Sequence, residues 1–196
     1  MRHIQYLYQH LGEVIHLSDD DKILVQSLFD EVSIQKGSFL LKEGEICTQL
    51  AFVCKGIFRY YIDQDGEDRT YNFAKEGEFV CNYESLIRRS PSPKHIQAIE
   101  DSEILTISSE NLQRFYREVN EGNLFGRIHM EKIYAETIRQ LVTHYTETPE
   151  ARYLNFLKKH PDLNQRLPQY YIASYVGVKP PSLSRIRKRL TSKVTY

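Results

Sequence analysis

The sequence predicts an α+β protein in which an N-terminal antiparallel β-barrel or jelly roll is followed by a long helix and a C-terminal helix-turn-helix. Three observations predict this class. Short β-rich segments separated by glycines occupy residues 32–107, an uninterrupted helical pattern covers about 123–145, and residues 169–188 have the pattern of two crossed helices. At 196 residues, the chain is long enough for one core of about 110 to 150 residues and a small second domain.

The first element expected is a short helix, because Ser18 precedes three aspartates and can cap a helix that ends near Asp30. Seven or more short strands are then expected, with segments around residues 32–34, 39–41, 50–53, 57–62, 69–73, 95–98 and 103–107. The Asp65-Gly66 pair between two of these segments predicts a β-hairpin. A series of this kind closes into a barrel or a sandwich.

The chain becomes helical again after Ser109, which can cap a short helix, and its longest element is expected over about 123–145. The apolar residues of this long helix fall into two stripes. One stripe comprises Leu124, Ile128, Ala135, Ile138, Val142 and Tyr145, and the other comprises Met130, Ile133, Tyr134 and Leu141. Because two stripes need two partners, we expect one to pack on the barrel and the other on a second subunit; the alternative is a helix buried within one chain. Thr148-Pro149 then caps a further helix that runs to His160.

Residues 169–188, QYYIASYVGVKPPSLSRIRK, predict the helix-turn-helix. Ala173 supplies the small residue where the two helices touch, and Gly177 permits the left-handed turn between them. The residues expected to face inward are Ile172, Val176, Val178, Leu183 and Ile186, and those expected to face outward are Ser182, Ser184, Arg185, Arg187 and Lys188. We expect Pro180 to be the N-cap and Pro181 the first helical residue, which would leave the N–H groups of Ser182 and Leu183 free.

The charge distribution points to a nucleic-acid partner for this segment. The chain holds 26 Lys and Arg and 26 Asp and Glu, but residues 150–196 contain ten basic and two acidic residues, against 16 basic and 24 acidic in residues 1–149. A basic module attracts the DNA backbone, so double-stranded DNA is the expected partner. Arg185 is expected to read a base, and the phosphate contacts are expected from Lys179, Ser182, Ser184, Arg187 and Lys188. The alternatives are a solvated helix, or a basic tail that contacts a protein partner.

Several other classes lack support in the sequence. No apolar run approaches the roughly 18 to 20 residues of a membrane span, and the first residues lack a signal peptide, so a cytoplasmic location is expected. The three cysteines Cys47, Cys54 and Cys81 have no CxxC spacing and are expected to be reduced thiols. With no His-x-His pair and no Gly-x-Ser-x-Gly, we expect neither an enzyme nor a metal or other cofactor.

Four segments resemble the Crp/Fnr transcription regulators, and the resemblance covers nearly the whole chain. They are GIFRYYIDQDGEDRT, EGEFVCNYESL, RYLNFLKKHPDL and YYIASYVGVKPPSLSRIRKRL. The resemblance implies a sensor barrel over residues 1–120, a dimerisation helix over 121–146 and a DNA-binding domain over 147–196. It also implies a homodimer on half-sites about one helical turn apart, with RNA polymerase as a further partner.

The resemblance refines the DNA contacts. Arg185 matches an arginine that hydrogen-bonds guanine in such regulators. The two residues that often share base reading fall on Pro180 and Pro181, so the family's operator sequence cannot be transferred to this chain. Only six residues follow Leu190, so the β-hairpin wing that commonly follows the motif is expected to be truncated or missing.

The resemblance also implies where a cyclic nucleotide would bind. With Gly77-Glu78-Phe79 as anchor, the ribose-binding Gly-Glu of the family falls on Cys81 and Asn82, and the phosphate-binding Arg-Ser falls on Ser92 and Pro93. Thr137 matches a position that touches the base. Because the arginine and the carboxylate are missing, cyclic AMP should bind weakly or not at all.

Other effectors stay open at this stage. The alternatives are an anion site at Arg88, Arg89 and Lys94, haem held by His95, His129 or His144, and a redox switch at Cys81 if the pKa of its thiol is depressed. The iron–sulfur cysteines that oxygen-sensing relatives carry near the N-terminus are missing, since Cys47 is the first cysteine.

Overall fold

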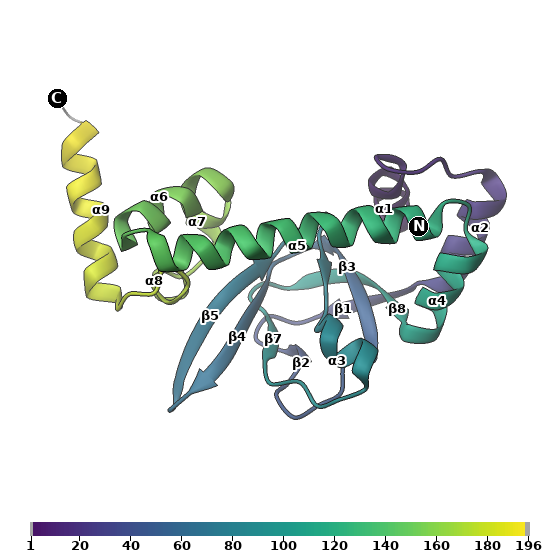
Figure 1. The fold of residues 1–196 in the computed structure, drawn as a ribbon, viewed down its shortest axis with the longest axis horizontal. Helices are drawn as coiled ribbons and strands as arrows, with labels where there is room; N and C mark the ends of the chain where they lie inside the picture. The colour runs from purple at the N-terminus through teal and green to yellow at the C-terminus, as the bar shows by residue number, and fades with distance from the viewer. Residues whose placement is uncertain (1, 195–196) are drawn as a thin grey trace. The chain divides into compact units, whose positions relative to one another are not determined.

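The computed structural model describes residues 2–194 of the chain, with side chains to residue 192. These residues fall into two compact units, one formed by residues 2–62 and 72–133 and the other by residues 63–71 and 134–194. Figure 1 shows the order of the elements along the chain. The unit boundaries pass through one β-hairpin and one long helix, so both units contain parts of these two elements.

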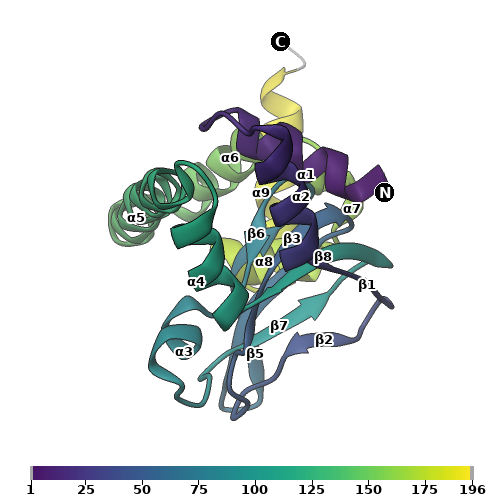
Figure 2. The same ribbon diagram turned by 90° about the vertical axis from the view of Figure 1, so that its right-hand side faces the viewer.

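Two helices open the first unit, α1 (Arg2–Gly12) and α2 (Asp19–Leu28). The second was predicted: Ser18 is its N-cap, and Ser18 and Asp21 form a reciprocal capping box. The first was not predicted, although Ile4, Leu7 and Leu11 recur at helical spacing and are buried. Helix α1 packs against the strands β3 (Gln49–Lys55) and β8 (Ser102–Ser108), as Figure 2 shows.

The strands form two four-stranded sheets, and the register is antiparallel in the pairs β1–β8, β3–β8, β3–β6, β2–β7 and β4–β7. One sheet has the order β1-β8-β3-β6, and the other has the order β2-β7-β4-β5. The strands not yet given are β1 (Asp30–Ile34), β2 (Phe39–Leu41), β4 (Phe58–Gln64), β5 (Glu67–Ala74), β6 (Phe79–Val80) and β7 (His95–Ala98). All seven predicted strands are present, and the two-residue strand β6 was missed.

The core of the first unit includes residues of both sheets and of the helix that covers one of them. Phe52, Phe58, Ile96, Ile104 and Ile107 are fully buried, and the ring of Phe52 packs against Tyr6 and His10 of α1, with ring centres 5.4 and 5.3 Å apart. The predicted hairpin turn is confirmed, because Asp65 and Gly66 both have positive φ, 56° and 77°, as a tight two-residue turn requires.

Three helices complete this part of the chain: α3 (Tyr83–Arg88), α4 (Ser109–Glu118) and α5 (Gly122–Thr146). Helix α3 was not predicted. Ser108, not Ser109, caps α4, because the Ser108 hydroxyl accepts the amide of Asn111. The correction is small, since two adjacent serines offer equivalent caps and only the backbone geometry selects one.

The long helix α5 covers the predicted span. The two predicted apolar stripes do not differ in burial, because each contains both half-buried and exposed residues. Leu124, Ile128 and Met130 are half-buried. The exposed apolar residues come from both stripes: Ile133, Tyr134, Ile138, Leu141, Val142 and Tyr145. Tyr134, Ile138, Leu141 and Tyr145 alternate four and three residues apart, which places them on one face.

The second unit contains the rest of α5, the hairpin tip formed by residues 63–71, and four further helices. These are α6 (Pro149–Lys159), α7 (Leu163–Arg166), α8 (Gln169–Val176) and α9 (Pro180–Val194). Thr148 caps α6 as predicted. Helix α9 continues to Val194, so residues up to 194 contain no strand of a wing, and residues 195 and 196 lie outside the described part. No helix among the described residues is long and apolar enough to cross a bilayer.

Candidate nucleic-acid interface

Helices α8 and α9 form the predicted helix-turn-helix. Gly177 adopts the left-handed conformation with φ of 79°, which a non-glycine residue reaches only at a cost. Its amide and that of Val178 donate to the carbonyl groups of Ser174 and Ala173, at 3.0 and 2.9 Å, and so end α8. Four of the five predicted inward residues, Ile172, Val176, Leu183 and Ile186, are buried, as is Ala173, and Val178 is half-buried.

The start of α9 differs from the prediction. The helix begins at Pro180, not Pro181, and the carbonyl of Lys179 accepts the amides of Ser182 at 2.9 Å and Leu183 at 3.2 Å. The expectation of free N–H groups at Ser182 and Leu183 was therefore wrong. The physical reason is that two successive prolines supply no donors, so the next amides close the first turn on Lys179. Side chains are therefore the groups at this helix start that could contact an anion.

Those side chains are available. Lys179, Ser184, Arg185, Arg187 and Lys188 are exposed, and Ser182 is half-buried. All six predicted contact residues lie on α9 or directly before it, so the structure brings them together on one element. Lys179 has a partner within its unit, an ion pair with Glu67. Arg189, which was not predicted, pairs with Glu150 at 3.1 Å and links α9 to α6.

A residue that the sequence did not single out ties the motif to the helices that precede it. Arg152 of α6 donates from Nε to the carbonyl of Val176 at 2.8 Å, and from Nη1 to the carbonyls of Glu147 at 2.7 Å and His144 at 3.3 Å. One guanidinium thus joins the ends of α5 and α8. The planar fork of arginine suits several acceptors at once. No local sequence pattern signals this role, because all three partners are carbonyl groups.

Two of the residues aligned with the family's nucleotide-binding positions (the cassette, Cys81, Asn82, Ser92 and Pro93) form hydrogen bonds within the first unit. The buried Asn82 donates from its amide to Ser92 Oγ at 2.9 Å, and it caps α3. Ser92 Oγ in turn donates to the carbonyl of Lys94 at 2.8 Å and accepts the Lys94 amide at 3.2 Å. Asn82 at the aligned ribose position and Ser92 at the aligned phosphate position are therefore hydrogen-bonded to each other. Pro93 is exposed, and Thr137 is an exposed residue of α5 in the second unit.

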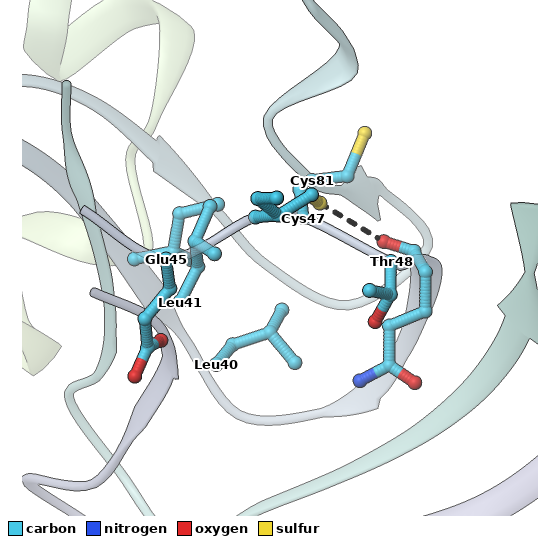
Figure 3. A pocket seen from close by; sticks show the side chains of 9 residues that line it. Leu40, Leu41, Glu45, Cys47, Thr48 and Cys81 are labelled. Carbon is cyan, nitrogen blue, oxygen red and sulfur yellow. Dashed lines mark hydrogen bonds between the residues drawn. The ribbon is translucent and has the colours of Figure 1, made fainter. Parts of the chain in front are cut away.

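A cavity of about 190 Å³ lies inside the first unit, bordered by Leu40, Leu41, Glu45, Ile46, Cys47, Thr48, Gln49, Cys81 and Ile96. Figure 3 shows it. Small-molecule pockets are typically about 300 to 1,000 Å³, so this cavity is small for a nucleotide. It offers a single carboxylate, that of Glu45, and no cationic side chain that could pair with a phosphate.

The two cysteines at this cavity have the character of packed thiols. Cys47 Sγ donates to the carbonyl of Gln49 at 3.3 Å, as the dashed line in Figure 3 marks. Burial raises the pKa of Cys81 and that of Cys47 above the ordinary range. All three cysteines are free. Because a redox-active cysteine needs a depressed pKa, the structure argues against the redox alternative for Cys81.

The three histidines considered for haem lie in different surroundings. His95 stacks on Tyr61 with ring centres 4.6 Å apart, and His144 is exposed. His129 stacks on Phe125 at 5.7 Å in an aromatic cluster that includes His10. Burial lowers the pKa of His129 to about 4, so its ring is neutral at neutral pH. Among the described residues, no group of three or more His, Cys, Asp or Glu side chains could hold a metal ion.

Comparison with known proteins finds a family model that matches part of the chain. Residues 31–119 match the family model of the cyclic nucleotide-binding domain. A search of curated proteins finds no significant match to the sequence.

Solved structures extend the match to most of the chain. The c-di-GMP responsive global regulator CLP of Xanthomonas campestris aligns over 90% of this chain and 93% of its own, with a TM-score of 0.69 and 16% identity. FixK2 of Bradyrhizobium japonicum aligns over 84% and 85%, with a TM-score of 0.68 and 18% identity. A putative Crp/Fnr transcriptional regulator of Eubacterium rectale aligns over 90% and 85%, with a TM-score of 0.66 and 16% identity. The chain has the Crp/Fnr regulator fold.

This match confirms the predicted fold class and the resemblance on which the site was aligned. The Crp/Fnr fold combines the jelly-roll-like sheets, the long helix α5 and the C-terminal helices in the order seen here. Two of the proteins above are described as a global regulator and a putative transcriptional regulator. At these identities the match concerns the fold, and the contact residues of α9 stay predictions.

Proposed function

We propose that the protein is a sequence-specific DNA-binding transcription regulator that acts as a homodimer and is not controlled by cyclic AMP. The observation that carries this proposal is the recognition helix α9. Its inner face is buried through Leu183 and Ile186, while the side chains of Arg185, Arg187 and Lys188 are all exposed. A rigid helix with a cationic outer face fits the major groove and its flanking phosphates.

The DNA proposal is tested by random-site selection with the full chain, followed by fluorescence anisotropy on the selected duplex. Arg185→Ala should weaken binding to that duplex by about 5- to 150-fold, corresponding to about 1 to 3 kcal/mol, and relax the preference at one base pair. Arg187→Ala is the matched control, since a phosphate contact should weaken all sequences alike. An equal loss on every sequence for Arg185→Ala contradicts its role in base reading.

The homodimer is supported by the exposed apolar face of α5. Tyr134, Ile138, Leu141 and Tyr145 are 69%, 42%, 52% and 81% exposed, which is unusual for a row of large apolar side chains. Their alternating spacing of four and three residues suits a helix pair. Leu141→Asp should convert the dimer to a monomer in analytical ultracentrifugation. Ile23→Asp, on an exposed residue of α2, is the control and should leave the dimer intact.

Independence from cyclic AMP is supported by the hydrogen bond between Asn82 and Ser92. The family's carboxylate and arginine are both replaced, and their replacements are bonded to each other. Titration calorimetry with cyclic AMP and cyclic GMP should show no binding. Micromolar affinity for either nucleotide contradicts this part of the proposal. The CLP regulator is described as responsive to c-di-GMP, so this nucleotide belongs in the same titration as a candidate effector.

A second candidate is a module whose basic helices contact a protein partner instead of DNA. The basic excess of residues 150–196 fits an acidic protein as well as a duplex. Salt separates the two, because DNA binding releases condensed counterions and weakens steeply with salt. We propose RNA polymerase as a further partner and the cytoplasm as the location, which co-purification from the native host and cell fractionation would test.

A further inference from the structure

The tip of the β4–β5 hairpin belongs to the same compact unit as the helix-turn-helix. Residues 63–71 cluster with residues 134–194, whereas the remainder of β4 and β5 belongs to the sheet of the first unit. This hairpin is therefore a covalent link between the cyclic nucleotide-binding domain and the DNA-binding module, separate from the connection through α5.

Specific hydrogen bonds hold the tip against the module. Ser174 of α8 accepts the amide of Thr70 at 2.8 Å and donates its hydroxyl to the carbonyl of Asp68 at 2.9 Å. Gln140 of α5 donates its side-chain amide to the carbonyl of Tyr71 at 2.6 Å. A single hydroxyl that both accepts from and donates to the hairpin backbone fixes the position of the strand.

The tip carries the opposite charge to the face beside it. It contains Asp63, Asp65, Glu67 and Asp68 against one basic residue, Arg69. The carboxylate of Glu67 pairs with the ammonium group of Lys179 and also with Arg69 at 2.9 Å. Lys179 directly precedes α9, where its ammonium group would meet a DNA phosphate. Glu67 and a phosphate would therefore compete for the same cation.

We propose that the hairpin tip is an autoinhibitory latch on the DNA-binding module. Glu67 occupies Lys179, and the Ser174 bonds hold the tip in the position from which Glu67 reaches that cation. This inference rests on the proposed DNA-binding function and concerns its regulation. Because β4 and β5 continue into the sheet of the first unit, a shift of these strands is the physical route by which that unit would release the latch.

The test compares three variants of the full chain by fluorescence anisotropy, on the duplex obtained by random-site selection. Glu67→Gln removes the competing charge, and Ser174→Ala removes the hydroxyl anchor without changing any charge. Asp65→Asn is the matched control, because Asp65 lies at the same tip outside the Lys179–Glu67 pair, and asparagine tolerates its positive φ of 56°. Thermal unfolding of each variant verifies that it is folded.

The latch predicts that Glu67→Gln and Ser174→Ala each tighten DNA binding by about 2- to 5-fold, the range of an exposed ion pair. Asp65→Asn should change it by less than about 1.5-fold, since its charge acts only through screened solvent. In a Lys179→Ala background, Glu67→Gln should do no more than Asp65→Asn, because the cation for which it competes is gone.

Two results would overturn the latch while leaving the DNA-binding proposal intact. One is equal tightening by Glu67→Gln and Asp65→Asn, which would be a general charge effect. The other is weaker DNA binding by Ser174→Ala in a folded variant, which would make the hairpin a support of the active form. If neither the wild type nor Glu67→Gln binds any duplex at low salt, the DNA-binding proposal and the latch both fall. Binding by Glu67→Gln alone would support the latch.

Discussion

Replacing Arg152 by alanine should loosen the second unit of the chain selectively. The guanidinium makes two short, partly buried hydrogen bonds, to Val176 at 2.8 Å and Glu147 at 2.7 Å, and a longer, exposed one to His144 at 3.3 Å. A hydrogen bond from a charged donor contributes about 1.5 to 3 kcal/mol net. Taking the lower value for the two short bonds and neglecting the third, we expect a loss of about 3 kcal/mol.

Hydrogen exchange is the appropriate assay, because the loss should be confined to one unit of the chain. Amides of α8 should exchange about 100-fold faster in Arg152→Ala, while those of β3 should be unchanged. Arg127→Ala is the control: its exposed ion pair with Glu131, at 2.7 Å, should be worth under about 0.5 kcal/mol. If Arg152→Ala costs no more than Arg127→Ala, the guanidinium is not the clamp that the geometry suggests.

Three further predictions concern single residues. Gly177→Ala should destabilise the helix-turn-helix by about 1 to 2 kcal/mol in urea unfolding. The reasons are the φ of 79° at this position and the added Cβ, which would lie 3.3 Å from Arg152 Nη2. An unchanged stability would contradict the claim that the turn requires glycine. Asn82→Ala should cost about 1 to 2 kcal/mol by the same assay, since it removes the bond to Ser92 and the cap of α3, whereas Asn123→Ala at an exposed site should cost under about 0.5 kcal/mol. Equal losses of stability for Asn82→Ala and Asn123→Ala would argue against a stabilising role of the Asn82–Ser92 hydrogen bond. The third prediction concerns the pH dependence of stability. Burial lowers the pKa of His129 from 6.5 to about 4, so between these pH values the unfolded chain binds a proton that the folded chain does not bind. The free energy of unfolding should therefore fall as pH drops from about 6.5 towards 4. His129→Phe should flatten this dependence, and an unchanged pH profile would mean that other groups cause it.

Local signals in the sequence were sufficient for most of the fold. The Ser18 cap, the Asp65-Gly66 turn and the Thr148-Pro149 start are set by the chemistry of one or two adjacent residues, and all three are confirmed. Strand β6 was missed because two residues carry no periodicity. The start of α9 was misplaced by one residue, since the rule against a helical residue before proline is a preference that packing can override.

The candidate site could be predicted only in part. The exposed basic residues of α9 follow from helical spacing, and their exposure agrees with it. Contacts between distant residues had no such signal: Glu67 pairs with Lys179, which is 112 residues later in the chain, and Arg152 bonds only carbonyl groups. Likewise, alignment indicated that the cassette had lost its arginine and carboxylate. The bond between their replacements, Ser92 and Asn82, required the three-dimensional structure.

The most direct test of the account is the affinity of the full chain for its selected duplex as a function of salt, measured by fluorescence anisotropy. If a dimer places two recognition helices on the duplex and contacts about six to ten phosphates, affinity should fall by about three to five orders of magnitude between roughly 50 and 200 mM salt. The absence of binding to any duplex at the lowest salt, or an affinity that salt leaves unchanged, would contradict the claim that α9 docks on DNA.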